Sequence, residues 1–330
     1  MAELTTKYAG LYLKNPIIIG SSGLTDSVEK IKELEKFGAG AVVLKSLFEE
    51  EIIHESDQMI RIAKSDPLLY DRLSETLDYV DLYVKEKTVS KYLRLISESK
   101  KNTLFPIIAS INCITAGEWI STSKKIQDAG ADALELNIFI PPTENRECSE
   151  IENLHIEIIK KVKKNVTIPI IVKISSYFPN LINFIINLSK TGIDGIVLFN
   201  RFYKPDIDVE NIKLFSENIY SNEYEYLETL RWTAIVSGKI NSSISASTGI
   251  HNGETVIKML LAGAKSVQVV SAIYKNKASY IERMIQDIEK WMLKNNFNYI
   301  DQFIGKLSSE QKNTSAFERM QFMKLYSGIK

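Results

Sequence analysis

Short apolar runs recur along the chain, and each is introduced in one of two ways. In the first, a proline precedes isoleucines, as at 15–19, 105–108 and 168–171. In the second, a helix end and a glycine lead into the run, as at 37–44, 129–136, 191–198 and 262–269. Proline can open a strand, and glycine ends a helix in the left-handed conformation. The runs are apolar throughout, which predicts strands covered on both faces.

Segments with helical periodicity lie between these runs, at 26–37, 117–129, 150–162, 180–189, 227–236, 253–261 and 279–293. Alternation of strand and helix at this spacing predicts parallel βαβ units. The eight expected strands are 16–20, 41–46, 106–112, 133–140, 169–175, 195–200, 244–248 and 266–271. We therefore expect an α/β fold, a single (β/α)8 TIM barrel over residues 1–330, with an open doubly wound sheet as the alternative.

Two insertions interrupt the alternation, at about 47–104 and 201–226. From Leu47 to Lys101 there is no glycine, and 74–99 is predicted to be helical, which gives a helical insertion after the second strand. The other is a loop insertion after the sixth strand. Both follow even-numbered strands and so lie over the expected active face. A lid over the site and a contact between two subunits both remain open for each insertion.

Composition narrows the classes of function. The 330 residues are 45% hydrophobic, with 41 basic and 41 acidic side chains, so neither a nucleic-acid footprint nor a polybasic membrane patch is present. No apolar run approaches the roughly 20 residues that span a bilayer, and the first ten residues lack the apolar segment of a signal peptide. Two cysteines form no metal-binding or disulfide pattern. We expect a cytoplasmic protein with a small-molecule substrate, no nucleic-acid or membrane partner and no metal.

Polar residues at the strand ends carry the candidate chemistry, because barrel enzymes place their sites there. Lys45 and Lys173 each end an apolar strand, and a buried lysine requires a partner, which predicts a bound anion. Asn137 and Asn200 lie within or just after apolar strands, where a buried amide must be hydrogen-bonded. Other polar strand ends are Ser21, Ser22, Gly23, Ser46 and Asn112.

The ends of the last two strands predict a phosphate site. Barrels frequently bind phosphate with these loops and a short helix N-terminus. The turn Ser247-Thr248-Gly249 offers backbone N–H groups and hydroxyls, and Ser271 adds another hydroxyl.

These residues together resemble the FMN-dependent dihydroorotate dehydrogenase family. The resemblance runs from about Asn15 to Ile288, and its matching stretches are 15–16, 21–23, 45–46, 133–137, 169–173, 248–250 and 267–272. It implies a flavin that lies along Ser21, Ser22 and Gly23. It also implies that Lys173 faces the flavin N1/O2 edge and stabilises the charge that develops on reduction.

The resemblance assigns further roles around the flavin. Lys45 would lie between flavin and substrate, and Asn137 and Asn200 would bind the substrate or the ring. The residues expected to hold the ribityl phosphate are Ser247, Thr248, Gly249, Val270 and Ser271. The resemblance also implies a homodimer and a place in pyrimidine biosynthesis.

The chain departs from the family pattern at the position of the general base, which takes a proton from dihydroorotate in family members. Family members carry Asn-Leu-Ser-Cys-Pro-Asn, whose cysteine is the general base, whereas this chain has Phe139 and Ile140 at the serine and cysteine positions. Isoleucine accepts no proton. The family's glycine-containing substrate loop after the second strand is also missing. A replacement base could come from Cys113, with Tyr177, His54 and a tyrosine of the loops as the other candidates.

Three hypotheses follow from the sequence. The first is an FMN-dependent oxidoreductase of the dihydroorotate dehydrogenase type, in which Lys45 and Lys173 are catalytic and the substrate can differ from dihydroorotate. The second is a barrel that binds FMN without catalysis. The third is a flavin-free, aldolase-like barrel that forms a Schiff base on Lys173 or Lys45.

Overall fold

Eight parallel strands close into a barrel within the residues that the computed structural model describes, 2–48, 77–113, 119–140, 145–202, 205–215 and 219–309. The barrel strands are β3 (Ile17–Ile19), β4 (Ala41–Val43), β6 (Ile107–Cys113), β7 (Ala133–Ile138), β8 (Ile170–Ile174), β9 (Gly195–Leu198), β12 (Ser243–Ser247) and β13 (Ser266–Val269). All eight coincide with strands expected from the sequence. The TIM barrel is therefore confirmed, and the open doubly wound sheet is excluded.

Closure of the sheet is visible in its pairing. Strand β3 pairs with both β13 and β4, and β4 pairs in parallel with β6, which joins the two ends of the sheet. A short strand β5 (Leu47–Phe48), which the sequence pattern did not predict, extends the pairing along β6. Because every strand is parallel, all carboxyl ends meet at one mouth.

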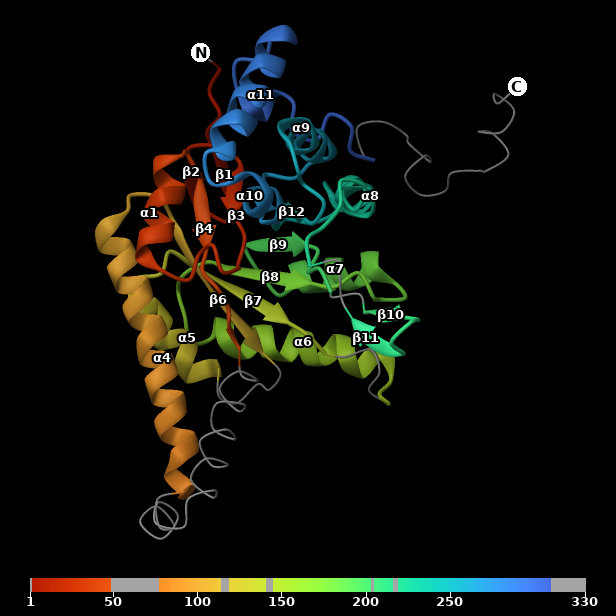
Figure 1. Ribbon diagram of the computed structural model, residues 1–330. Coiled ribbons are helices and arrows are strands. Elements are labelled where there is room, and N and C mark those ends of the chain that lie inside the picture. The colour runs from red at the N-terminus through yellow and green to blue at the C-terminus, as the bar shows by residue number, and fades with distance from the viewer. Residues whose placement is uncertain are drawn as a thin grey trace.

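Helices surround the barrel (Figure 1). Their bounds are α1 (Val28–Lys36), α4 (Leu77–Asn102), α5 (Trp119–Asp128), α6 (Cys148–Lys163), α7 (Leu181–Lys190), α8 (Tyr226–Val236), α9 (Gly253–Ala262), α10 (Ser271–Asn276) and α11 (Tyr280–Lys294), followed by a 3-10 turn η1 (Ile300–Gln302). The long α4 is the helix expected in the first insertion. None of the helices in the described part of the chain combines the length and apolar character that crossing a membrane requires.

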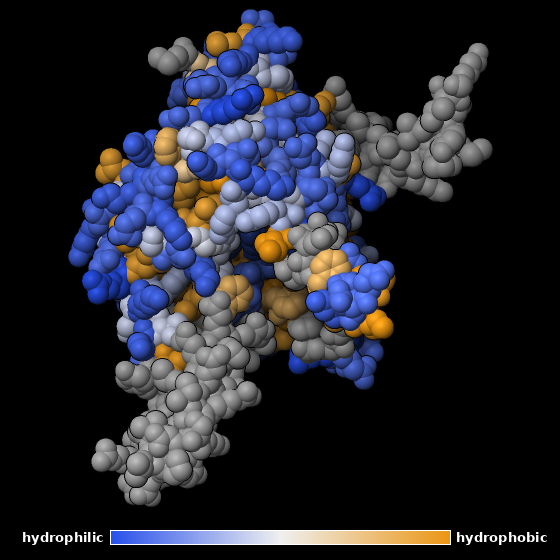
Figure 2. Space-filling view, viewed as in Figure 1, coloured by the Kyte–Doolittle hydropathy of each residue, from blue (hydrophilic) through white to orange (hydrophobic). Residues whose placement is uncertain are grey.

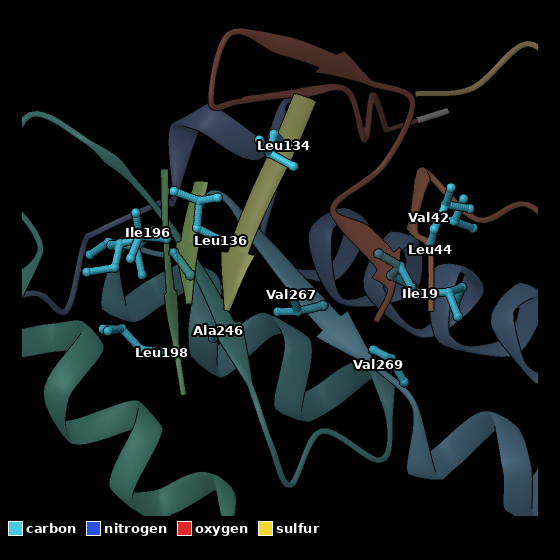
Figure 3. Close-up of a cluster of buried hydrophobic side chains, with 14 of the residues drawn as sticks. Ile19, Val42, Leu44, Leu134, Leu136, Ile196, Leu198, Ala246, Val267 and Val269 are labelled. Carbon is cyan, nitrogen blue, oxygen red and sulfur yellow. The ribbon is translucent and has the colours of Figure 1, made fainter. Parts of the chain in front are cut away.

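The main hydrophobic core fills the layer between the barrel and the helices. Outward-facing strand residues such as Leu134, Leu136 and Ile196 are completely buried there (Figure 3). Alternate residues of the same strands face into the barrel, because side-chain direction has a period of two along a strand. On β7, the inward set begins with Ala133 and continues with Glu135 and Asn137, so that polarity increases toward the mouth.

An N-terminal hairpin closes the opposite end of the barrel. Strands β1 (Thr6–Tyr8) and β2 (Leu11–Leu13) are antiparallel and joined by Ala9 and Gly10, whose φ angles are 48° and 81°. Two consecutive positive φ angles are typical of the tight hairpin turn that matches strand twist. The buried side chains of this hairpin pack on the apolar bottom layer of the barrel, which includes Val197. The sequence pattern did not predict this plug.

The second insertion contains structure beyond the loop that the sequence predicted. Strands β10 (Asp206–Asp208) and β11 (Lys213–Phe215) form an antiparallel hairpin, and the chain then returns to the barrel mouth before α8. Figure 1 shows this hairpin beside the carboxyl ends of β7 and β8.

Candidate functional site

A cavity of about 300 Å³ lies at the carboxyl ends of the strands. Its volume is at the lower end of the range of small-molecule and cofactor sites. Eight residues expected to bind the cofactor line it, namely Ser21, Lys173, Asn200, Ser247, Thr248, Gly249, Val270 and Ser271. The other lining residues are Arg201, Ile219, Ser221, Ile250 and Gln268. Figure 2 shows a hollow near the middle of the molecule, with both hydrophobic and hydrophilic surface around it.

Lys173 belongs to a hydrogen-bonded chain that runs into the barrel. Its Nζ donates to Gln268 Oε1 at 3.0 Å, and Gln268 Nε2 donates to Glu135 Oε2 at 2.5 Å. Glu135 is 0% exposed, and its Oε1 has no hydrogen-bond partner. The carboxylate therefore orients the Gln268 amide, and the amide oxygen in turn holds the ammonium group at the cavity. A lysine fixed in this way presents a positive charge in a constant position.

The turn after β12 has the geometry of an anion site. Thr248 and Gly249 both have left-handed backbones, with φ angles of 81° and 74°. Successive turn residues of this kind direct backbone N–H groups into a common concavity, which binds anions. A Cβ on Gly249 would lie 2.2 Å from the backbone nitrogen of Tyr226, so no larger residue fits. Helix α10 begins beside this turn at Ser271, without a side-chain cap.

Part of the second insertion folds over this turn. Ser221 N donates to Ser271 Oγ at 3.0 Å, and Ser221 Oγ lies 2.9 Å from His251 Nε2. Lys275 Nζ donates to the carbonyl oxygen of Ser221 at 3.0 Å. Burial is the largest effect on the pKa of His251 and lowers it, and the charge of Lys275 lowers it further. The insertion therefore covers the predicted phosphate end of the cavity.

Three asparagines lie close together at the barrel mouth, Asn112 on β6, Asn137 on β7 and Asn200 just after β9. Asn200 Nδ2 donates to Asn137 Oδ1 at 2.9 Å, and Asn137 pairs in register with Asn112. Asn112 is buried, and its Oδ1 has no hydrogen-bond partner among the described residues. A buried amide oxygen without a partner is rare in a folded protein and is expected to accept from a ligand. The N3–H group of a flavin is a donor of this kind, so the orphaned oxygen and the left-handed turn both fit FMN.

The remaining residues expected to bind the cofactor lie beside the cavity rather than on its lining. Ser46 N donates to Ser21 Oγ at 2.9 Å, which fixes the end of β3 against the end of β4. Ser22 caps its own turn, since its hydroxyl donates to the carbonyl of Gly20 at 3.2 Å, and Gly23 follows in that turn. Lys45 is exposed at the mouth.

The candidates for a general base remain unassigned. Cys113 ends β6, but its side chain lies outside the described part of the chain, as does His54. Tyr177 is described and is 56% exposed. Ile140 is half-buried and lines a small cavity together with Tyr177 and Cys148. Within the described ranges, no three His, Cys, Asp or Glu residues gather as a metal site would require.

Two functional residues escaped the sequence analysis for an identifiable reason. Gln268 and Glu135 lie inside strands, one and three residues before the strand ends to which the search was confined. A polar residue in an otherwise apolar strand was their available signal. Nothing in the sequence pattern marked Ser221, because it reaches Ser271 only through the folding of the second insertion.

The comparisons with known proteins agree with this arrangement. A family model described as dihydroorotate dehydrogenase matches residues 3–292. The dihydroorotate dehydrogenase B (NAD(+)) catalytic subunit of Thermoplasma volcanium is 27% identical over 92% of this chain and 98% of its own length. A relative of the same name from Alkaliphilus oremlandii is 27% identical over 91% and 97%. A putative dihydroorotate dehydrogenase A (fumarate) from Aeropyrum pernix is 23% identical over 92% and 97%.

Proposed function

The chain belongs to the dihydroorotate dehydrogenase family, and from this premise we propose that it is an FMN-dependent oxidoreductase whose substrate differs from dihydroorotate. Family members bind FMN, which supplies a two-electron hydride acceptor. One observation carries the proposal. The ammonium group of Lys173 is held in place in the same cavity that contains the left-handed turn Thr248–Gly249.

Different residues of this chain would bind the phosphate, stabilise the reduced flavin and bind the planar ring. The backbone N–H groups of the turn and the Ser271 hydroxyl bind the phosphate. Lys173 places a positive charge where negative charge accumulates during reduction, which is the usual way in which a site lowers a barrier of this kind. Asn112, Asn137 and Asn200 offer amide groups to a planar ligand.

The identity of Ile140 separates this chain from dihydroorotate oxidation. At the position where the family has a cysteine base, an isoleucine side chain packs against the core. The loss of a general base costs about 10²–10⁴ in rate. We therefore propose that dihydroorotate reduces the protein slowly or not at all.

The Schiff-base alternative is less well supported. A nucleophilic amine must be neutral and accessible. Lys173 instead donates to Gln268, one link from the Glu135 carboxylate, which is the arrangement of a fixed charge. A barrel that binds FMN without catalysis would have the same cavity. It would differ from the proposed enzyme only in that no substrate reduces its flavin.

The deciding experiment is the visible spectrum of the purified protein, followed by anaerobic addition of dihydroorotate. We expect a flavin spectrum that persists after mixing. Rapid bleaching would show that dihydroorotate is the substrate. No flavin spectrum, even after incubation with FMN, would overturn the proposal and favour the Schiff-base barrel.

The electron acceptor is a separate question. Two of the relatives above are named for NAD(+) and one for fumarate, so both are candidates for this chain. Each can be tested by reoxidation of the photoreduced protein.

A further inference from the structure

Three aromatic rings gather at the mouth of the barrel, at the ends of adjacent strands. The Phe139 and Phe202 ring centroids are 4.8 Å apart, and those of Tyr177 and Phe202 are 5.5 Å apart. Phe139 follows β7, Tyr177 follows β8 and Phe202 follows β9. We call these three residues the aromatic rim. The rings of Phe139 and Phe202 are half-buried, and that of Tyr177 is 56% exposed, so the rim retains surface for a ligand.

The rim lies one step outward from the paired asparagines. Asn137 and Asn200 are hydrogen-bonded to each other, and Phe139 and Phe202, each two residues further along the chain, are also in contact. The amide pair and the ring pair therefore lie on the same two chain segments, with the rings further from the strands.

The cations of the neighbouring cavity are occupied by the protein itself. Arg201 Nε donates to Glu225 Oε2 at 2.8 Å, and its terminal nitrogens donate to the carbonyl oxygens of Ile219 and Tyr220 at 3.0 and 3.2 Å. Arg201 and Glu225 are mostly buried in this ion pair. Lys173 is bound to Gln268. Arg201 cannot bind a substrate carboxylate without giving up these contacts, which would leave polar groups of the protein unsatisfied. The remaining N–H donors of Lys173 are directed to the flavin under the proposed function.

We propose that the substrate is an uncharged dihydro-lactam ring that carries an apolar or aromatic substituent, and that its oxidised, planar form is the product. The asparagine pair binds the lactam edge, whose alternating N–H and C=O groups match the donors and acceptors of two amides. The aromatic rim packs on the substituent through offset or edge contacts. A carboxylate at the same place would face ring surfaces that carry partial negative charge and would lose its water without gaining a partner. The inference rests on the proposed function, because it takes the asparagine pair to be the substrate end of a flavin site.

The test compares two ligands that differ only in this substituent. Orotate is uracil with a carboxylate at carbon 6, and 6-phenyluracil has a phenyl group there. Calorimetric titration of the FMN-loaded protein measures both affinities without turnover. We expect 6-phenyluracil to bind at least about tenfold more tightly than orotate. The Phe202→Ala variant should weaken 6-phenyluracil by about fivefold to tenfold, as the loss of an aromatic pair predicts, and should leave orotate unchanged.

A matched control removes a distant aromatic ring. Tyr12 is 79% exposed on the N-terminal hairpin at the other end of the barrel, so Tyr12→Ala should alter neither affinity. Equal or tighter binding of orotate, undetectable binding of 6-phenyluracil, or an unchanged affinity in Phe202→Ala would overturn the inference. Flavin content, measured beforehand, tests the proposed function separately. If FMN does not bind, that function fails, and the ranking of the two ligands is then measured on the flavin-free chain.

Discussion

The two sides of the barrel mouth are built from different kinds of contact. Around β8, β12 and β13, polar groups are held by directional hydrogen bonds, as in the chain from Lys173 through Gln268 to Glu135. Beyond the ends of β7, β8 and β9, the aromatic rim is held by ring packing, which is less directional than hydrogen bonding. A side governed by hydrogen-bond geometry tolerates few substitutions, whereas a packed apolar side can be exchanged without loss of the fold. Under the proposed function, this difference explains how the cofactor side of a site can be retained while the substrate side changes.

The largest expected effect comes from converting the apolar side to the family pattern. The double change Phe139→Ser and Ile140→Cys introduces a thiol at the base position and removes one ring of the aromatic rim. We expect flavin reduction by dihydroorotate to accelerate about 10²-fold or more, measured by stopped-flow absorbance. Phe139→Ser alone provides space without a base and should give no such gain. Equal rates in the two variants would show that the base is not the missing element.

A single substitution in the turn after β12 should disrupt phosphate binding on the polar side of the mouth. Gly249→Ala places a Cβ 2.2 Å from the Tyr226 nitrogen, in a residue whose φ is +74°, so the turn must move. The loss of two or more hydrogen bonds to a charged phosphate should weaken FMN about 100-fold, as measured by fluorescence titration.

Gly10→Ala is the matched control for this change. Gly10 has a φ of +81°, but the new Cβ would lie 3.8 Å from its nearest neighbour, Pro169 Cγ, which is an ordinary contact. It should cost about 1–2 kcal/mol in unfolding free energy from the strained backbone and leave FMN affinity unchanged. A comparable loss of FMN in both variants would argue against the turn as the phosphate site.

A smaller effect is expected in the flavin potential. Lys173→Met removes a charge-assisted contact of about 1.5–3 kcal/mol with the reduced cofactor, which lowers the two-electron midpoint potential by roughly 30–60 mV. Glu135→Gln removes a buried negative charge and should shift the potential in the opposite direction. Lys14→Met, at the exposed opposite end of the barrel, should not shift it. A common direction for Lys173→Met and Glu135→Gln would indicate a general disturbance of the fold instead.

The smallest expected effect is on stability against pH. Burial is the main cause that lowers the pKa of His155, which packs against Phe178 and Phe184. Burial also lowers the pKa of His251, at the phosphate end of the cavity. The charge of Lys275 lowers the pKa of His251 further, whereas Glu223 and Glu225 raise it. The unfolded imidazoles take up protons near the ordinary value of 6.5, whereas the folded ones do so only at lower pH. The free energy of unfolding should therefore fall as the pH drops below 6.5.

Denaturant titrations at pH 7.5 and 5.5 measure this loss. His155→Gln removes one titrating group and should make the loss smaller. If the variant loses as much stability as the original chain, burial of His155 does not contribute.

The sequence predicted the barrel well because glycine and proline mark the boundaries of nearly every strand. It also placed eight residues on the cavity, since a lysine or serine at the end of an apolar strand is easily recognised. The N-terminal hairpin escaped prediction because its strands have three residues each, too few for a periodicity to show. The aromatic rim escaped for another reason. Phe139, Tyr177 and Phe202 are far apart in the chain, and only the closed sheet brings their rings together.

Several expectations remain predictions. The cytoplasmic location, the homodimer, the extent of the domain over 1–330 and the roles of Lys45 and Cys113 require experiments of their own. Residues 49–76, which make up half of the first insertion, lie outside the described ranges, so its role as a lid or a subunit contact stays open as well.

The N-terminal hairpin also has a consequence for how the protein is made. Thr6 Oγ1 donates to the carbonyl oxygen of Lys265, a residue 259 positions later in the chain. At ordinary rates of translation, roughly 13–50 s separate the synthesis of these two residues. The hairpin therefore waits, with its apolar side chains uncovered, until almost the whole barrel has been synthesised. Packing of the N-terminal hairpin against the bottom of the barrel is therefore a late step of folding. The nascent chain is most prone to aggregation before that step.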